Sequence, residues 1–410
     1  MQINQQIMKR ITLSILSLFF ILFKSQAQTL TSEDSLSISG KNAATYIGGY
    51  GNAYYHYDSN QKQALINLER AVLFIGHRFN DKFSFLSEIE IEDAKVSGGE
   101  EGGEVAIEQA YLKFTLSRNS YLTAGLFLPR IGILNENHLP NTFNGNERTR
   151  IESLLIPSTW RELGVGFYTS LNNFPVELSF ALINGLNCAG FEHGNLIRGG
   201  RAEGREATAN NLALTGAVKY QKNNLVLQLS AYAGGSVGLP ATEARILNLS
   251  PGPFGTPVML TEGNIQYKIN AFSIKALATI VSIPDAEKIN NVFSNNTPEI
   301  AYGIYGEAAY DFLFKDDSEN KRSLFGFLRY EKFDLNATVP KNAVNDPVMD
   351  QQHIVLGLSY LPIPQIAVKA DVRFAKTGKE TIALPVNPDP LASPHKTNNT
   401  FINIGFGFSF

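Results

Sequence analysis

From residue 44 onward, the chain alternates apolar residues with polar or small ones in segments of roughly ten residues, the length of a membrane-crossing strand. One such segment places Phe83, Phe85, Ile89 and Ile91 on one face and Ser84, Glu88, Glu90 and Glu92 on the other. Similar alternation marks 211–220 and 365–374. A period of two residues is that of a β-strand whose two faces meet different surroundings. The pattern therefore predicts an all-β protein.

Sixteen segments follow this pattern, and we expect a strand in each: 44–57, 67–79, 83–95, 104–117, 121–128, 160–171, 175–184, 210–221, 224–235, 258–269, 272–281, 299–313, 322–335, 352–362, 364–375 and 399–410. The joints after the even-numbered strands are mostly tight, such as Asn80-Asp81 and Asn270-Ala271. The joints after the odd-numbered strands are longer: 58–66, 96–103, 129–159, 185–209, 236–257, 282–298, 336–351 and 376–398.

Short turns on one side and long loops on the other are the architecture of an outer-membrane barrel, in which the short turns face the periplasm. A soluble two-sheet protein would show the same alternation, but it would not show this asymmetry in its connections. We therefore predict a transmembrane antiparallel β-barrel of about 16 strands over residues 44–410. After Ala27 no stretch approaches the ~20 apolar residues that a spanning helix needs.

The joint at about residues 129–159, which follows the fifth strand, is the longest. Loops of such length inside a compact domain are uncommon and are usually functional or disordered. This one contains the apolar residues Ile151, Leu154, Leu155 and Ile156 and the aromatic anchors Phe143 and Trp160, which favours an ordered segment. Four arginines lie on or beside it: Arg130, Arg148, Arg150 and Arg161. We expect it to fold inward as a constriction loop that brings positive charge into the barrel.

The last strand supports the same architecture. Its even-numbered residues from Ile402 to Phe410 are all apolar, and the odd-numbered ones are polar or small. A terminal aromatic strand resembles the signal by which the barrel assembly machinery recognises outer-membrane barrels. We therefore expect Phe408 and Phe410 to act as an assembly signal. A sheet-edge strand of a soluble fold is the alternative, and it would leave five large apolar side chains to be buried elsewhere.

Residues 1–27 have the pattern of a secretory signal peptide. A basic start at Met8-Lys9-Arg10 precedes an apolar run over 11–23, and Ser25-Gln26-Ala27 supplies small residues for cleavage. An N-terminal membrane anchor is the alternative, which the short apolar run disfavours. Residues 28–43 then form a short periplasmic segment before the barrel, too little for the plug domain of an active transporter.

Composition excludes several other classes. A net charge of −3 and a pI near 6.1 argue against binding of nucleic acid. The single cysteine, Cys188, excludes an intramolecular disulfide. The six histidines are scattered without ligand-like spacing or a nearby nucleophile, so we expect no enzymatic activity and no cofactor. These observations leave the barrel interior as the place where function is expected.

Glu88, Glu90 and Glu92 share one face of a predicted strand and could ligate calcium, which takes several oxygen ligands. Neighbouring positions on one face of a strand are roughly 7 Å apart, however, which is too far for one ion without help from other strands. A solvated wall of the barrel interior, paired with loop arginines, is the favoured interpretation. We therefore expect no metal site in this row.

Several stretches resemble the phosphate-selective porin O and P family of Gram-negative outer-membrane porins: 88–93 (EIEIED), 107–112 (IEQAYL), 124–129 (AGLFLP), 132–136 (GILNE) and 156–162 (IPSTWRE). The resemblance implies a sixteen-stranded barrel, a homotrimer and a constriction loop after the fifth strand. The family's phosphate-specific members are described by ladders of basic residues. Here Arg329, Lys369 and Arg373 face the expected interior together with acids, among them Glu307, Glu331 and Asp371, and so favour no specificity for phosphate.

We therefore expect an outer-membrane porin of a Gram-negative bacterium that allows passive diffusion of small hydrophilic solutes or ions, with a weak preference for anions, phosphate being one candidate. Outer-membrane lipid and lipopolysaccharide would surround it. The expected ion path is lined by ten residues: Arg130, Arg148, Arg150, Arg161, Arg329, Lys369, Arg373, Glu88, Glu90 and Glu92. The alternative is a barrel that acts through its extracellular loops as a receptor, adhesin or enzyme.

The predicted topology can be tested with single cysteines in a Cys188→Ser background. Cysteines within 58–66, 185–209 or 376–398 should react with an impermeant maleimide on intact cells, because these joints are expected outside. Cysteines at Asn172 or Lys222 should react only after the outer membrane is permeabilised. The reverse labelling pattern would invert the topology.

Overall fold

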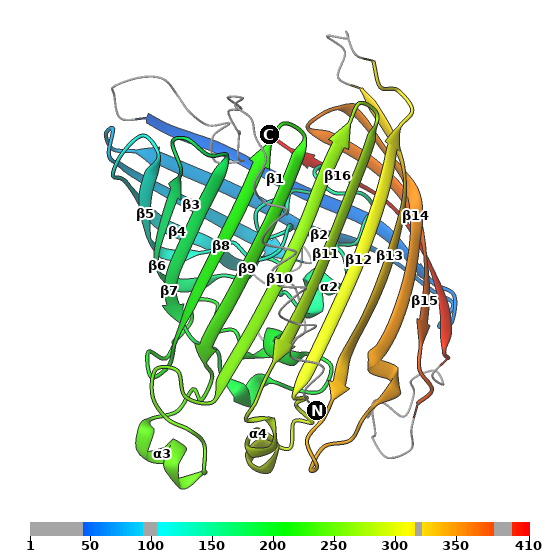
Figure 1. Ribbon diagram of the computed structural model, residues 1–410. Helices are drawn as coiled ribbons and strands as arrows, with labels where there is room; N and C mark the ends of the chain where they lie inside the picture. Colours follow the sequence, from blue (N-terminus) through cyan, green and yellow to red (C-terminus); the bar gives the residue numbers. More distant parts are fainter. Residues whose placement is uncertain (1–43, 93–104, 316–321, 381–395) are drawn as a thin grey trace, which may run out of the picture.

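The computed structural model of the protein describes residues 44–92, 105–315, 322–380 and 396–410. Sixteen antiparallel strands form one closed barrel, in which each strand pairs with its neighbours in sequence and β16 pairs with β1 (Figure 1). The predicted fold class is thereby confirmed. The expected signal peptide (1–27), the segment 28–43 and the joint 96–103 lie outside the described residues, as does most of 376–398.

The strands are β1 (Ala44–Asp58), β2 (Gln63–Arg78), β3 (Phe83–Glu92), β4 (Val105–Thr115), β5 (Ser120–Phe127), β6 (Glu162–Ser170), β7 (Val176–Asn184), β8 (Leu212–Lys222), β9 (Leu225–Gly235), β10 (Pro257–Ile269), β11 (Phe272–Ser282), β12 (Ile300–Asp311), β13 (Ser323–Thr338), β14 (Asp350–Ile363), β15 (Ile366–Thr377) and β16 (Asn398–Ser409). Short helices lie in the long loops: α2 (Ile151–Leu154), α3 (Ala241–Ile246), α4 (Ala286–Phe293) and the 3-10 helices η2 (Cys188–Gly190), η3 (Leu196–Gly200) and η4 (Pro347–Met349). None of the helices in the described ranges is long and apolar enough to cross a membrane.

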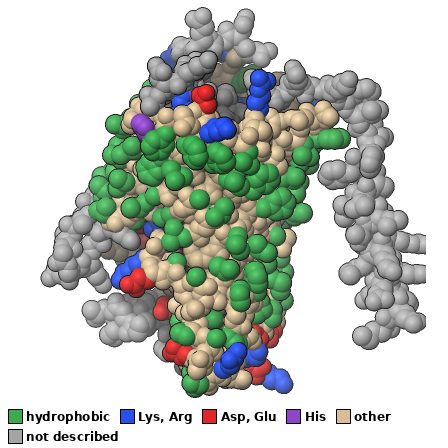
Figure 2. Space-filling model, turned by 90° about the vertical axis from the view of Figure 1, so that its left-hand side faces the viewer, with side chains coloured by type: hydrophobic (Ala, Val, Ile, Leu, Met, Phe, Trp, Pro, Cys, Tyr) green, Lys and Arg blue, Asp and Glu red, His purple; other side chains and the backbone are tan. Residues whose placement is uncertain are grey.

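The outward face of the barrel is apolar. On most strands alternate residues are exposed and large and aliphatic or aromatic, such as Phe180, Leu229 and Ile304. Figure 2 shows hydrophobic side chains over the middle of one side of the barrel and charged side chains towards its two ends. This distribution suits a surface that meets hydrocarbon in the middle and water at both ends.

The expected asymmetry of the connections is present, with one difference at the first joint. Strand β2 begins at Gln63, so residues 59–62 form a tight turn in place of the longer joint predicted at 58–66. The side chain of Asp58 closes this turn, since its Oδ1 accepts hydrogen bonds from the backbone N–H groups of Asn60 at 2.8 Å and Gln61 at 3.0 Å. The alternation of the sequence does not predict this turn, because residues 64–66, which belong to β2, are all apolar.

The barrel closes where β16 meets β1. The backbone of Phe410 exchanges two hydrogen bonds with that of Gly49, at 2.9 and 3.0 Å. The aromatic rings of Phe408 and Phe410 lie over the glycines opposite them, because a Cβ on Gly51 or Gly49 would meet these rings at 3.0 and 2.9 Å. Aromatic side chains that cover glycines across a strand pair stabilise that pairing. The end of the chain therefore contributes directly to the seam of the barrel.

We predict that deletion of Phe410 lowers the fraction of folded protein several-fold, because it removes two backbone hydrogen bonds and the ring that covers Gly49. The heat-modifiable form on gels measures the folded fraction, and unfolded chain should appear in the periplasm. Phe254→Ala, at an exposed loop position away from the seam, is the matched control and should fold normally. An unchanged folded fraction after the deletion would exclude an assembly role for Phe410.

Candidate functional site

The segment between β5 and β6, residues 128–161, lies inside the barrel, and we call it the inner loop (Figure 1). The backbone N–H of Arg150 donates to Glu331 Oε2 on β13, at 2.7 Å. Asn141 Nδ2 donates to the carbonyl of Pro364, in the turn between β14 and β15, at 2.8 Å. The loop therefore crosses the interior from β5 to the opposite wall and reaches the end of the barrel that carries the short turns.

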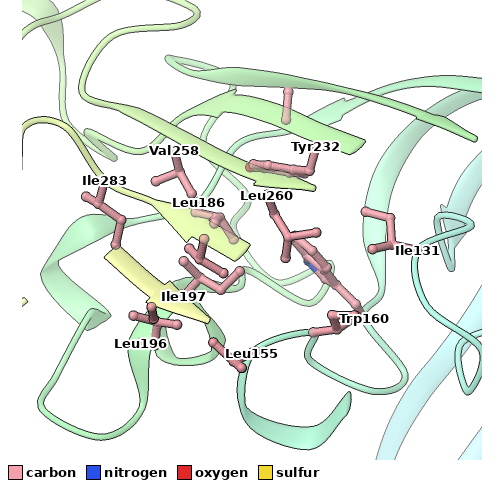
Figure 3. Close-up of a cluster of buried hydrophobic side chains, with 14 of the residues drawn as sticks. Ile131, Leu155, Trp160, Leu186, Leu196, Ile197, Tyr232, Val258, Leu260 and Ile283 are labelled. Carbon is pink, nitrogen blue, oxygen red and sulfur yellow. The ribbon is translucent and has the colours of Figure 1, made fainter. Parts of the chain in front are cut away.

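A cluster of buried apolar side chains holds both ends of the inner loop (Figure 3). Trp160 is fully buried, its ring lies 4.9 Å from that of Tyr232 on β9, and its Nε1 donates to Glu162 Oε1 at 3.0 Å. The other labelled members are Ile131 and Leu155 of the inner loop, Leu186, Leu196 and Ile197 of the loop after β7, and Val258, Leu260 and Ile283 of the wall around β10 and β11. Burial of each large apolar side chain contributes about 1.5–3 kcal/mol. One sector of the inner wall is therefore apolar, and it fixes the loop.

Glu152 joins the two limbs of the inner loop to the wall. Its Oε1 accepts hydrogen bonds from the backbone N–H groups of Ile133 and Leu134 at 2.6 and 2.7 Å, and its Oε2 accepts one from the hydroxyl of Tyr305 on β12 at 2.7 Å. These bonds compensate for the water that this buried carboxyl gives up. Burial nevertheless raises its pKa. At Gly132 the backbone has a φ of +78°, and a Cβ would meet Glu152 Oε1 at 2.8 Å, so this close approach requires glycine.

Three cations of the wall hold the middle of the inner loop. Lys369 Nζ donates to two backbone carbonyls of residues 143–145 at 2.8 Å each, and Arg329 Nη2 donates to a third at 2.7 Å. Arg373 Nε pairs with Glu147 Oε2 at 2.8 Å. Lys369, Arg329 and Arg373 therefore point inward, as the sequence predicted, and all three are engaged by the loop.

Acids of the same wall balance these cations. Arg329 Nε lies 3.1 Å from Glu307 Oε2 and its Nη1 lies 3.6 Å from Glu331 Oε1. Asp371 Oδ2 accepts a hydrogen bond from the backbone N–H of Asn146 at 2.8 Å. The wall opposite β5 and β6 consequently carries a network of charged side chains that pair with one another and with the inner loop.

Two of the four predicted arginines are paired in separate places. Arg130 lies 2.9 Å from Glu136 Oε1 and 3.0 Å from Glu177 Oε2 on β7. Arg161 lies 3.2 Å from Glu203 Oε2, in the loop after β7. The four arginines therefore do not form one cluster.

Arg148 and Arg150 are the less compensated pair. Arg148 Nη1 donates to Ser158 Oγ at 3.3 Å, but Arg148 Nη2 and Arg150 Nε are buried without a hydrogen-bond partner among the described residues. Burial lowers the pKa of both guanidinium groups, assisted by the neighbouring charges of Arg70 and Arg373 respectively. Acidic side chains act on both groups only at longer range, Glu108 on Arg148 and Glu147 on Arg150.

The predicted glutamate row also faces inward, but its partners differ from the expectation. Glu88 and Glu90 are buried, whereas Glu92 is half-buried. Glu90 Oε1 lies 3.8 Å from Arg70 Nη1 on β2, and Glu88 Oε2 lies 3.7 Å from His138 Nε2 in the inner loop. The row is therefore packed against other groups and is not a solvated wall paired with loop arginines.

Glu108 lies beside this row and is not among the residues that the sequence pattern predicted for the interior. The pairing of β3 with β4 passes from Glu88 opposite Gln109 to Ile89 opposite Ile107, so Glu108 is the extra residue of a β-bulge. Bulges redirect side chains and change which residues face inward. A second bulge adds Glu69 to β2 in the same way. The alternation of apolar and polar residues along the sequence does not predict the bulge at either residue.

No family model matches the chain. It is 32% identical over 338 residues to an uncharacterized protein of Aquifex aeolicus, a match that spans 79% of this chain and 74% of that one, and it belongs to the same family as that protein.

Solved structures of similar fold are outer-membrane channels. An anion-selective porin from Comamonas acidovorans is 10% identical, with a TM-score of 0.56 over 90% of this chain and 100% of that one. The outer membrane channel DcaP of Acinetobacter baumannii is 12% identical, with a TM-score of 0.54 over 90% of this chain and 98% of that one. Salmonella typhi OmpF, solved with daunomycin, is 11% identical, with a TM-score of 0.53 over 89% and 97% of the two chains. At these identities the likeness shows the fold, which is that of a porin-type barrel, while membership of the phosphate-selective family stays a prediction.

We predict that Glu147→Gln loosens the middle of the inner loop without opening the barrel. Arg373 and Arg150 beside this carboxyl hold its pKa below the usual range against the opposing effect of burial, so the ionised form is the one that stabilises the loop. Its stabilisation is present above the ordinary carboxyl pKa and is lost as pH falls through the depressed value. For a partly buried pair we expect hydrogen exchange of the amides at 143–150 to rise about tenfold.

Glu203→Gln, which neutralises the partner of Arg161 outside the inner loop, is the matched control. It should leave exchange at 143–150 unchanged. Equal exchange in the wild type and Glu147→Gln would show that the pair with Arg373 does not hold the loop.

Proposed function

We propose that this member of the family is an outer-membrane porin of a Gram-negative bacterium, through which small hydrophilic solutes or ions diffuse passively. Its fold is that of a porin-type barrel. The observation that carries the proposal is the inner loop, which is anchored to the wall on both sides of the interior and brings charged side chains with it. A loop of this kind would set the size and charge of the path, which is the role of a constriction.

We propose a weak preference for anions. The wall cations Arg329 and Arg373 have close acidic partners, whereas Arg148 and Arg150 each keep a nitrogen without a hydrogen bond and interact with acids only at longer range. In water a unit charge 4 Å from a passing ion contributes about 1 kcal/mol, and screening removes most of this beyond ~8 Å at physiological salt. The selectivity should therefore be only a few-fold. Because the cations are paired, the interior offers no support for a phosphate-specific ladder.

The assembly and surroundings of the porin are part of the proposal. The apolar outward face would meet outer-membrane lipid and lipopolysaccharide, and Phe408 and Phe410 at the seam would be read by the barrel assembly machinery. The resemblance to phosphate-selective porins supports a homotrimer. The ten residues expected along the ion path all belong to the barrel or the inner loop, with Arg148 and Arg150 proposed to contribute most to selectivity.

The test is conductance across a planar bilayer. The purified protein should give discrete channels, and its reversal potential under a salt gradient should indicate a few-fold preference for anions. Arg148→Glu combined with Arg150→Glu should shift the reversal potential towards cation selectivity while conductance is retained.

The matched control reverses two exposed arginines of the loops after β7 and β9, Arg205→Glu with Arg245→Glu, and should shift the potential much less. Absence of channels would contradict the porin. Channels whose selectivity does not change in the first double variant would contradict the role of the two inner-loop arginines.

A further inference from the structure

Three side chains of metal-ligand type meet inside the barrel, at a place where the sequence predicted no site. Glu88 comes from β3, Glu108 from β4 and His138 from the inner loop, and one ligand atom of each lies within 4.8 Å of the other two. The three residues are 9%, 0% and 8% exposed. Elements that are distant in sequence thus bring two carboxylates and an imidazole to one enclosed point.

Each of these side chains has a polar atom without a hydrogen-bond partner among the described residues. Glu88 Oε2, Glu108 Oε1 and His138 Nε2 are all buried and accept or donate no hydrogen bond within the described residues. Buried polar atoms are normally satisfied, and three unsatisfied ones at a single locus need an explanation. A cation bound between them would satisfy all three.

The remaining polar atoms orient the cluster. The hydroxyl of Tyr50 donates to Glu108 Oε2 at 2.8 Å, and the backbone carbonyl of Asn135 lies 3.4 Å from His138 Nδ1. A proton on Nδ1 that is donated to this carbonyl leaves the lone pair of Nε2 directed at Glu88. Metal-binding histidines typically donate their second ring nitrogen to a carbonyl or carboxylate in this way, and metal-binding carboxylates are held by similar hydrogen bonds.

We propose that Glu88, Glu108 and His138 bind a divalent transition metal ion of the zinc class. Zinc accepts histidine nitrogen together with carboxylate oxygen, whereas calcium takes oxygen ligands. Two carboxylates and a divalent cation are also electrically neutral together. The site would fasten the inner loop to the bulged pair β3 and β4, in the sector across the barrel from the cation-held segment 143–147.

A protonated His138 that pairs directly with the glutamates is the competing arrangement. Its Nε2 lies 3.7 Å from Glu88 Oε2, longer than the ~2.7–2.9 Å of a charge-assisted hydrogen bond. Two ligands of a tetrahedral zinc, with bonds of ~2.0–2.1 Å, lie about 3.4 Å apart, close to the 3.7 Å between His138 Nε2 and Glu88 Oε2. The three ligand atoms all lie within 4.8 Å of one another and would draw together around the ion.

The charges that face the cluster set its affinity. Arg148 from the inner loop and Arg70 from β2 interact with Glu108, and Glu90 lies on the other side of Arg70. The two guanidinium groups weaken binding of a cation, and neutralising the loop arginine should strengthen it. This dependence distinguishes the proposed site from adventitious binding at the surface.

The experiment measures zinc binding by untagged, detergent-solubilised protein after removal of metal with a chelator. The wild type should bind one zinc ion per chain, with affinity at least about tenfold higher than that of His138→Gln, Glu88→Gln or Glu108→Gln. Arg148→Gln should bind more tightly than the wild type. Cobalt in place of zinc should give visible absorption typical of nitrogen and oxygen ligands, and this absorption should disappear in His138→Gln.

His193→Gln and Glu203→Gln are the matched controls, because His193 pairs with Asp346 and Glu203 pairs with Arg161 and Arg201, and neither residue belongs to the inner loop or to the cluster. Both should bind zinc as the wild type does, and heat-modifiability should confirm that every variant is folded. His138→Gln lies in the inner loop and tests the site even if the strand variants fail to fold. The proposal is overturned if the wild type binds no stoichiometric zinc, or if folded His138→Gln binds it equally well.

Discussion

Strands in hydrocarbon must pair every backbone N–H and C=O group within the protein, and the architecture of this chain depends on that constraint. The sheet meets it by closing on itself, with β16 hydrogen-bonded to β1 and the rings of Phe408 and Phe410 lying over glycines of the first strand. A closed sheet of sixteen strands encloses more space than the side chains of its wall can fill. The interior is therefore available to a long loop, and residues 128–161 occupy it.

The inner loop is held by two kinds of interaction at different parts of the wall. Apolar packing around Trp160 fixes its ends, while paired charges on β12, β13 and β15 fix its middle. Partnerless charges in such a place would be strongly unfavourable, so each wall cation is matched by an acid or by backbone carbonyls. The same pairing limits the electric field that a passing ion would meet. Anchoring of the loop and the modest selectivity that we propose would thus have one physical cause.

The cluster of Glu88, Glu108 and His138 in the interior depends on a departure from regular strand geometry. The bulge in β4 turns Glu108 towards Glu88, and the inner loop adds His138 to them. Two porin-type barrels share this fold although their sequences are only 10% and 12% identical to this one, so the barrel itself tolerates wide changes in sequence. Barrels of this fold can then differ in the charged side chains that the bulges and the inner loop bring together in the interior.

The period of two residues predicts the number of strands, the alternation of short and long connections, and the inward direction of residues such as Arg329, Lys369 and Glu88. The sequence by itself also indicated an ordered loop after the fifth strand. Tertiary structure alone decided the partners: Glu147 with Arg373, Arg130 with Glu136, and Glu88 with Glu108 and His138. Bulges shift the period by one residue at positions that composition does not mark, and contacts across the barrel join residues far apart in the chain. No local pattern can encode such contacts, because they exist only once the sheet has closed around the loop.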